Sequence, residues 1–154
     1  AVASLLELEV IDETGAMSGN VYALTEKVSL TQQDIRALQL AKAAIMAGIR
    51  CLLHAAGCEE SEITTVYLAG GFGRYLNMES AVRIGLIPPT LADRVCVIGN
   101  AAVDGAALLL TNIDLRDKAD RIKKLARHIR LDGNVYFSTQ YMESMMFGTD
   151  MDSF

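Results

Sequence analysis

The sequence lacks the cysteine pattern of a metal or disulfide protein. Its three cysteines, Cys51, Cys58 and Cys96, are odd in number and form no C-x-x-C pair, so neither a disulfide framework nor a zinc or iron–sulfur site is indicated. We expect each cysteine to be a small buried hydrophobic residue. Histidine is equally scarce, and we expect neither His54 nor His128 to bind a metal.

Two further absences restrict the class of protein. Lysine and arginine number 14 against 19 aspartates and glutamates, which gives a net charge of −5, and no basic stripe stands out to neutralise phosphates. We therefore exclude DNA and RNA as partners. No apolar run approaches the roughly 20 residues of a membrane span, and the N-terminus lacks the layout of a signal peptide. We expect a cytoplasmic protein without a membrane segment.

Apolar residues, by contrast, are plentiful, at 51% of the 154 residues, which is ample for the core of one domain or of a fragment of a larger one. The patterns predict helices over 1–11, 32–56, 78–84, 101–110, 115–127 and 137–147, with fraying after Gly148. Strands are predicted at 21–24, 28–30, 65–69, 95–98 and 129–131. Strand, glycine turn and helix follow one another twice, in the alternating order that indicates an α/β fold with parallel strands covered by helices.

The longest predicted helix has clear end signals. Thr31 caps its start, Asp34 reinforces the cap from the N3 position, and nothing breaks the pattern until Gly57. We expect its buried stripe to consist of Ile35, Leu38, Ala41, Ile45, Ile49, Leu52 and Ala56. A neighbouring polar stripe, typical of a solvated face, consists of Gln32, Gln39 and Lys42. In the helix over 115–127, the residues expected to face inward are Leu115, Ala119, Ile122, Leu125 and Ala126.

The most informative stretch is residues 65–74 (Thr-Val-Tyr-Leu-Ala-Gly-Gly-Phe-Gly-Arg). A β-branched and aromatic run ends in glycines, and Asn77 then caps the next predicted helix. Such turns occur where the backbone needs a positive φ or approaches something bulky, and the helix that follows offers N–H groups to an anion. A nucleotide is the natural candidate. Leu76 stands where a dinucleotide fingerprint needs glycine, and no P-loop lysine follows, so the turn is of another kind.

Taken with several further segments, this stretch resembles a known family: the C-terminal part of the ATP-dependent reductive activators of corrinoid proteins. Their ATPase module belongs to the superfamily of sugar kinases, heat-shock chaperones and actin (ASKHA). The likeness runs through nearly the whole chain. Besides 65–74 it includes residues 10–15 (Val-Ile-Asp-Glu-Thr-Gly), 30–35 (Leu-Thr-Gln-Gln-Asp-Ile), 39–45 (Gln-Leu-Ala-Lys-Ala-Ala-Ile), 84–88 (Ile-Gly-Leu-Ile-Pro) and 99–107 (Gly-Asn-Ala-Ala-Val-Asp-Gly-Ala-Ala).

The resemblance implies an adenosine site. In that superfamily two glycines let the backbone lie against adenosine, a following basic residue can stack on adenine, and the preceding long helix supplies polar contacts. By position, the cofactor-binding residues would be Gly70, Gly71, Phe72, Gly73 and Arg74 of the turn, with Gln39 and Lys42 of the helix. Gly73 replaces the serine or threonine of many members, so a hydroxyl contact is missing there. The helix that begins at Ala101 resembles the superfamily's second connecting helix, which packs near the interdomain hinge.

The same resemblance implies that residues 1–154 are the C-terminal lobe of a longer chain. The Asp-x-Gly loops that hold ATP phosphates and magnesium are not among these residues, nor is the family's iron–sulfur domain. The implied function is the adenosine half of an ATP site in an activator that drives electrons to a corrinoid protein, with ATP and magnesium as cofactors and the iron–sulfur cluster upstream. Two alternatives remain: a kinase-type phosphotransferase of the same superfamily, or a non-catalytic interaction or dimerisation module that uses the methionine-rich tail.

Overall fold

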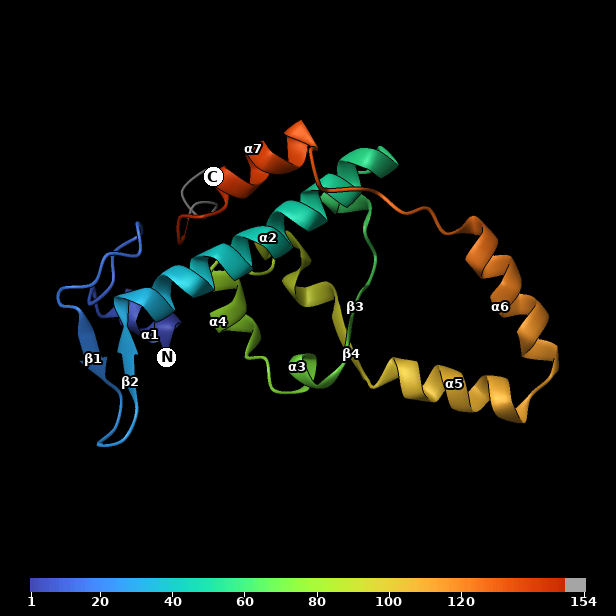
Figure 1. The fold of residues 1–154 in the computed structure, drawn as a ribbon, viewed down its shortest axis with the longest axis horizontal. Helices are drawn as coiled ribbons and strands as arrows, with labels where there is room; N and C mark the ends of the chain where they lie inside the picture. The colour runs from blue at the N-terminus through green and yellow to red at the C-terminus, as the bar shows by residue number, and fades with distance from the viewer. Residues whose placement is uncertain (149–154) are drawn as a thin grey trace.

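The structure is a computed structural model that describes residues 1–148, except for the side chain of Phe72; our expectation of fraying concerns residues outside this range. Figure 1 shows one long helix, α2, as the spine of the molecule, with α7 along it and α1 and α4 packed below. The helices are α1 (Val2–Glu7), α2 (Gln32–Ala56), α3 (Gly71–Arg74), α4 (Met78–Arg83), α5 (Ala101–Thr111), α6 (Asp114–Leu125) and α7 (Val135–Glu143), with 3-10 helices η1 (Glu60–Glu62) and η2 (Pro89–Arg94). The strands are β1 (Val21–Ala23), β2 (Ser29–Thr31), β3 (Val66–Ala69) and β4 (Val95–Gly99).

The ends of α2 confirm their sequence signals. The Thr31 hydroxyl accepts a hydrogen bond from the Asp34 amide at 3.2 Å, and the Asp34 carboxylate accepts one from the Thr31 amide at 2.8 Å. At the other end Gly57 takes the left-handed conformation, with φ of 65°, which a glycine adopts without strain. The 25 residues between these caps make a rod of about 37 Å.

Two separate strand pairs form. β1 and β2 make an antiparallel hairpin, whereas β3 and β4 are parallel, with Val66 opposite Val95 and Leu68 opposite Val97. The connection from β3 to β4 passes through α3, α4 and η2, so the unit is a β–α–β crossover. This parallel pair confirms the predicted α/β class.

The core has two centres, and residues of α2 contribute to both. The first joins both ends of the chain to α2 through Leu5, Ile11, Ile35 and Phe147. The second fills the crossover with Ala81, Leu86, Ile87 and Leu91, and Val66 and Val95 pack against it. This packing holds β3 in place and so fixes the position at which the strand ends.

The buried face of α2 differs from the predicted stripe. Ile35 is fully buried, but Ala41 and Ala56 are exposed, and the side chains of Ile45 and Leu52 are 45% and 55% exposed. The residues actually buried include Gln39 and Lys42, at 4% and 1% exposure, so the expectation of a solvated face was wrong. The cause is the C-terminal segment, which packs along this face and presents backbone carbonyl oxygens that accept hydrogen bonds from both side chains.

Other differences are local. α1 ends at Glu7 rather than at residue 11, because Glu9 takes a positive φ of 54° and Ile11 then bridges to Met17. Residues 129–131 form no strand, since no strand among the described residues pairs with them. The stretch after Gly70 contains a short helix, α3, that was not predicted, and a 3-10 helix begins at Pro89.

The cysteines and the apolar face of α6 also depart from expectation. Cys51 is buried as predicted, but Cys58 is half-buried and Cys96 is exposed.

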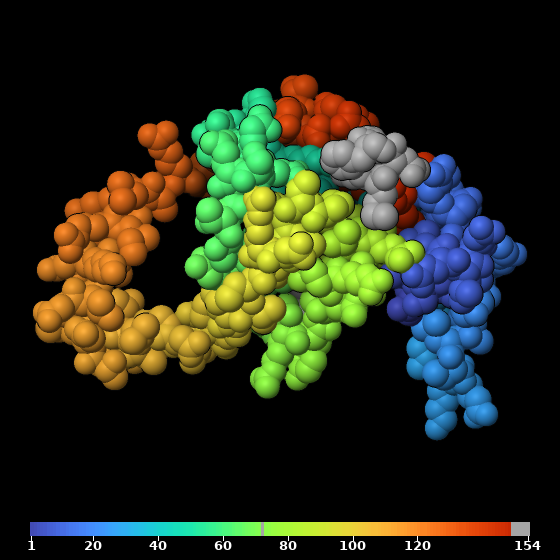
Figure 2. Space-filling model, turned by 180° about the vertical axis from the view of Figure 1, so that it is seen from behind, coloured from blue at the N-terminus to red at the C-terminus, as the bar shows by residue number. Residues whose placement is uncertain are grey.

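The structure describes all residues of α6, and none of them is buried. The residues predicted to face inward, Leu115, Ala119, Ile122 and Leu125, therefore have no core to face, and Ala126, just beyond α6, is exposed too. Figures 1 and 2 show why: α5 and α6 form an arm that projects from the rest of the molecule.

Membrane-span criteria select one helix among residues 1–148. By length and composition alone α2 could cross a membrane, a test that the core helix of a soluble protein also passes. Its alanines raise the mean hydropathy although polar residues interrupt the run. Lys42 and Gln39 lie on its buried face and donate hydrogen bonds to backbone carbonyls of the C-terminal segment, and α7 packs along it. These contacts are those of a core helix.

Candidate functional site

The glycine turn begins where β3 ends. Gly70 takes φ of +89°, a conformation that glycine adopts without strain, and its amide donates a hydrogen bond to the Gly99 carbonyl at 2.5 Å. Gly99 in turn ends β4 and has φ of +65°. The two glycine turns therefore meet at the carboxyl ends of the parallel strands, which is the edge where ligands bind in open α/β sheets.

Open space lies beside the first two glycines of the turn. A Cβ atom added at Gly70 or Gly71 would meet no other atom within 4 Å. At Gly73, by contrast, an added Cβ would come within 3.0 Å of the Leu68 Cβ, so this glycine is required for packing of α3 against β3. The first two positions thus leave room for a bulky group to approach the backbone, and the third does not.

The basic residue of the turn is exposed. Arg74 ends α3 and forms no salt bridge with any described residue, and the neighbouring Tyr75 is 85% exposed. Phe72 lies on α3, and its side chain is outside the part of the structure that is described. The turn thus carries an exposed guanidinium and is followed by an exposed phenol ring, both groups that can stack on a planar ligand.

Gln39 and Lys42 lie elsewhere. The Gln39 Nε2 donates to the carbonyl oxygens of Thr14 and Met145, at 3.0 Å each. The Lys42 ammonium donates to the Met146 carbonyl and lies 5.3 Å from the centre of the Phe147 ring. The structure thus brings the two α2 residues together with both ends of the chain, and it does not join them to the glycine turn by any described hydrogen bond.

The turn at residues 12–15, which belongs to the same polar cluster, is internally ordered. The Thr14 hydroxyl donates to the Asp12 carboxylate at 2.6 Å and the Ala16 amide donates at 2.9 Å. These two hydrogen bonds lower the pKa of Asp12 below its ordinary value. An added Cβ at Gly15 would come within 2.5 Å of the Gln39 Oε1, so the glycine lets the turn close on α2.

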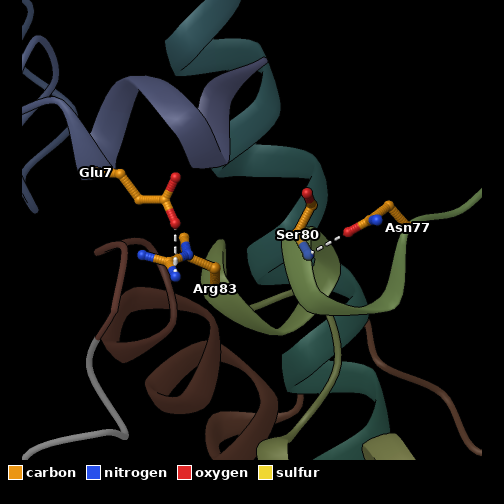
Figure 3. Close-up of polar contacts among 4 residues, drawn as sticks. All are labelled: Glu7, Asn77, Ser80 and Arg83. Carbon is orange, nitrogen blue, oxygen red and sulfur yellow. Dashed lines mark hydrogen bonds and ion pairs between the residues drawn. The ribbon is translucent and has the colours of Figure 1, made fainter.

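The helix after the turn is fixed from two sides, as Figure 3 shows. The side-chain oxygen Oδ1 of Asn77 accepts a hydrogen bond from the Ser80 amide at 2.8 Å and so caps α4, as predicted. Arg83 at the other end of α4 pairs with Glu7 of α1 at 2.7 Å. Both charged side chains are more than a third exposed, so the pair adds little stability, but it ties α1 to the helix that follows the turn.

A separate cavity of about 610 Å³ lies between α2, α4, η2 and the C-terminal segment. Its lining is mostly apolar and includes both basic and acidic residues (Lys42, Arg50, Arg83, Glu79 and Asp93), and no residue of the glycine turn lines it. The Ser144 hydroxyl at this cavity is buried and has no hydrogen-bond partner within residues 1–148. Residues 1–148 also contain no group of three or more metal-ligating side chains.

Sequence reasoning missed two residues of the site. Gly99 and Asn100 stand beside the first turn only because β3 and β4 pair in parallel, and the Asn100 side chain caps α5 by accepting from the Val103 amide at 3.3 Å. The sequence signal that could have identified them is the second strand–glycine–helix pattern. That pattern points to the site only if β3 and β4 are known to pair, which a single sequence does not reveal.

Comparisons with known proteins agree on one family. Residues 3–154 match the family described as the C-terminal domain of RACo, the ASKHA domain. The corrinoid activation enzyme RamQ of Eubacterium limosum is 36% identical over 124 residues, which cover 80% of this chain and 21% of that protein. The [Co(II) methylated amine-specific corrinoid protein] reductase of Methanosarcina barkeri is 24% identical over 151 residues, covering 97% of this chain and 28% of that protein.

A solved structure supports the same fold. The reductive activator for corrinoid, iron–sulfur protein superposes with a TM-score of 0.82 at 25% identity. The match covers 95% of this chain and 27% of that chain. The 154 residues therefore span less than a third of the length of each relative. The ASKHA C-terminal lobe expected from the sequence is confirmed as the fold.

Proposed function

Because the chain belongs to the family of the C-terminal ASKHA domain of RACo, we propose that it forms the adenosine half of an ATP site in a reductive activator that drives electron transfer to a corrinoid protein. Its relatives are corrinoid activation enzymes and reductive activators by name. The supporting observation is the open space beside Gly70 and Gly71 at the carboxyl ends of β3 and β4. A nucleotide is the class of ligand that such a backbone cradle fits.

Each residue of the turn has a distinct part in this proposal. Gly70 supplies the positive φ that turns the chain away from β3, and Gly71 leaves the backbone bare so that the adenosine can lie against it. The Arg74 guanidinium lies over the adenine plane, and Phe72 and Gly73 complete the turn. Gln39 and Lys42 contribute without touching the nucleotide, because a direct contact would require them to give up their hydrogen bonds to the carbonyl oxygens of Met145 and Met146.

The phosphates and magnesium belong, in this proposal, to the part of an activator that precedes its C-terminal domain. The residues described here offer the adenosine contacts and no metal-binding group of three or more ligands. The iron–sulfur cluster is likewise assigned to the preceding part, and the protein to the cytoplasm. ATP, when bound, supplies the free energy that favours a conformation competent to reduce the cobalt of the partner. The role of this lobe is to hold the nucleotide in that conformation.

Photo-crosslinking tests the proposal. The intact activator is irradiated with 8-azido-ATP in the presence of magnesium, and the labelled peptides are mapped by mass spectrometry. Labels within residues 70–76, removed by an excess of ATP, are the expected result. Labels confined to other parts of the polypeptide would contradict the adenosine assignment.

A further inference from the structure

The cavity between α2, α4, η2 and the C-terminal segment has the size and lining of a small-molecule site. Its volume of about 610 Å³ lies within the range of roughly 300 to 1,000 Å³ that such sites occupy. Apolar side chains predominate in its walls, namely those of Met46, Met78, Val82, Pro89 and Ala92. No residue of the glycine turn lines the cavity, so a ligand here is distinct from the proposed nucleotide.

Hydrogen-bond donors lie at the buried end of the cavity. Ser144 is 4% exposed, and its hydroxyl has no hydrogen-bond partner within residues 1–148. A buried hydroxyl without a partner costs free energy, which a ligand with an acceptor oxygen would recover. Lys42 is 1% exposed, and a Cβ atom added at Gly85 would come within 3.2 Å of its Nζ, so a side chain at position 85 would crowd the ammonium group. A carboxylate complements this end of the cavity.

The opposite charge lies at the mouth of the cavity. Glu79 of α4 and Asp93 of η2 line the cavity and are exposed, and neither forms a salt bridge with any residue of 1–148. The basic residue nearest to Glu79 in sequence, Arg83, pairs with Glu7 of α1 at 2.7 Å, as Figure 3 shows. A cationic group is what the carboxylates at the mouth can pair with.

Charges of opposite sign therefore come from different walls. Lys42 and Arg50 belong to α2, whereas Glu79 and Asp93 belong to α4 and η2. A ligand with positive charge alone would face the basic wall, and a ligand with negative charge alone would face the carboxylates, so each would meet repulsion. A zwitterion whose two charges are separated by an apolar body meets a complementary group on both walls.

We propose that this cavity binds a dipeptide with apolar side chains, which enters with its free carboxylate first. The carboxylate accepts a hydrogen bond from the Ser144 hydroxyl and lies beside the Lys42 ammonium group. The amino group of the dipeptide pairs with Glu79 and Asp93 at the mouth, and its side chains pack on the apolar walls. The proposal does not depend on the proposed function, since the glycine turn takes no part in it.

Calorimetric titration of the intact activator, without nucleotide, tests the proposal. The probe is leucyl-leucine, and two analogues of the same shape each lack one charge. Leucine 3-methylbutylamide has no carboxylate and should bind on the order of tenfold more weakly, because it loses a buried charge-assisted hydrogen bond. N-acetyl-leucyl-leucine has no ammonium group and should bind about fivefold more weakly, because the ion pairs it loses are exposed.

Variants of the protein assign each charge of the ligand to its partner. Ser144→Ala should weaken binding of leucyl-leucine by about tenfold and leave that of leucine 3-methylbutylamide unchanged. It should not destabilise the fold, because it removes a hydroxyl that has no partner. The double variant Glu79→Gln and Asp93→Asn should weaken leucyl-leucine by about fivefold and leave N-acetyl-leucyl-leucine no weaker than before. Glu26→Gln, at an exposed glutamate outside the cavity, is the control and should change none of these affinities.

Hydrogen exchange shows where the dipeptide binds. Saturating leucyl-leucine should slow the exchange of amides in α4 and in residues 144–148, because the ligand bridges these two elements. The amides of the β1–β2 hairpin contribute nothing to the cavity and should exchange at the same rate with and without the dipeptide.

Three results would overturn the proposal. The first is the absence of leucyl-leucine binding at millimolar concentration, or equal binding of the dipeptide and both analogues. The second is binding that neither Ser144→Ala nor the double variant changes. The third is binding that appears only after removal of residues 149–154, which would make that segment the occupant of the cavity. Because nucleotide is absent throughout, none of these results depends on whether the adenosine assignment is correct.

Discussion

The side chain of Gln39 joins the two ends of the chain. Its Nε2 donates to the carbonyl oxygens of both Thr14 and Met145 at 3.0 Å, while the Arg36 guanidinium donates to its Oε1 at 2.7 Å. All three hydrogen bonds lie in a part-buried setting. A residue expected on a solvated stripe is therefore a structural centre of the lobe.

Gln39→Leu should destabilise residues 1–154 by about 1 to 3 kcal/mol, because it removes the donor to the part-buried Met145 carbonyl oxygen, while the Thr14 carbonyl oxygen keeps its hydrogen bond from Arg36. Denaturant unfolding measures the change. Gln33→Leu on the exposed side of the same helix is the matched control and should change stability by less than about 0.5 kcal/mol. Equal effects of the two substitutions would show that the described contacts of Gln39 contribute nothing.

The aromatic residues of the C-terminal segment differ in burial, and their substitution should differ in cost. Phe147 is 1% exposed and packs with Leu5, Ile11 and Ile35, so Phe147→Ala should destabilise by about 3 to 5 kcal/mol. Phe137 is only half-buried and stacks on Tyr141, and Phe137→Ala should cost less. Denaturant unfolding of both variants measures the order, and a larger loss in Phe137→Ala would contradict it.

Acid should weaken the start of α2. Hydrogen bonds from the Thr31 hydroxyl and the Thr31 amide lower the pKa of Asp34 below its ordinary value of 3.8. A lowered folded-state pKa stabilises the protein above the unfolded value, and this contribution is lost as pH falls below 3.8 through the folded-state pKa. Thermal melts between neutral pH and pH values below this range should show a smaller acid-induced decrease for Asp34→Asn than for the wild type. An identical decrease would exclude Asp34 as a contributor.

Local chemistry made a large part of the fold predictable. The capping pair Thr31 and Asp34, and Gly57 at the other end, define α2 within a few residues of sequence, and Asn77 does the same for α4. The glycine turn after β3 was predictable for the same reason. Each of these features depends on contacts between residues that are close in sequence, where one chain's pattern is informative.

Burial of α2 was not predictable in this way. The partners of Gln39 lie 25 and 106 residues away, so periodicity alone cannot say which face they cover. The apolar side of α6 shows the opposite case. Its pattern predicts a buried face, and none of its residues is buried in the described structure. For the candidate site, the sequence pattern predicted the position of the glycine turn, and the family resemblance suggested which ligand it binds. The position of Gly99 beside Gly70 follows only from the parallel pairing of the strands in the structure.

Arg74→Ala in the intact activator should weaken ATP binding by roughly five- to thirtyfold, because stacking of a guanidinium on adenine contributes on the order of 1 to 2 kcal/mol when partly desolvated. Fold stability should not change, since Arg74 is exposed. Arg127→Ala, at another exposed arginine outside the turn, is the matched control and should bind ATP like the wild type. Calorimetric titration measures both, and equal affinities for the two variants would remove the stacking role.

The central claim is that adenosine lies against the bare backbone of the glycine turn, and Gly71→Val tests it most directly. Gly71 does not have a positive φ and has open space around it, so valine fits the fold and occupies only the space assigned to the nucleotide. Gly19→Val, at another glycine with open space and no positive φ, is the control. Calorimetric titration of the intact activator with ATP should show no binding to Gly71→Val and wild-type binding to Gly19→Val, with equal thermal melts. Wild-type ATP affinity in a folded Gly71→Val variant would contradict the account.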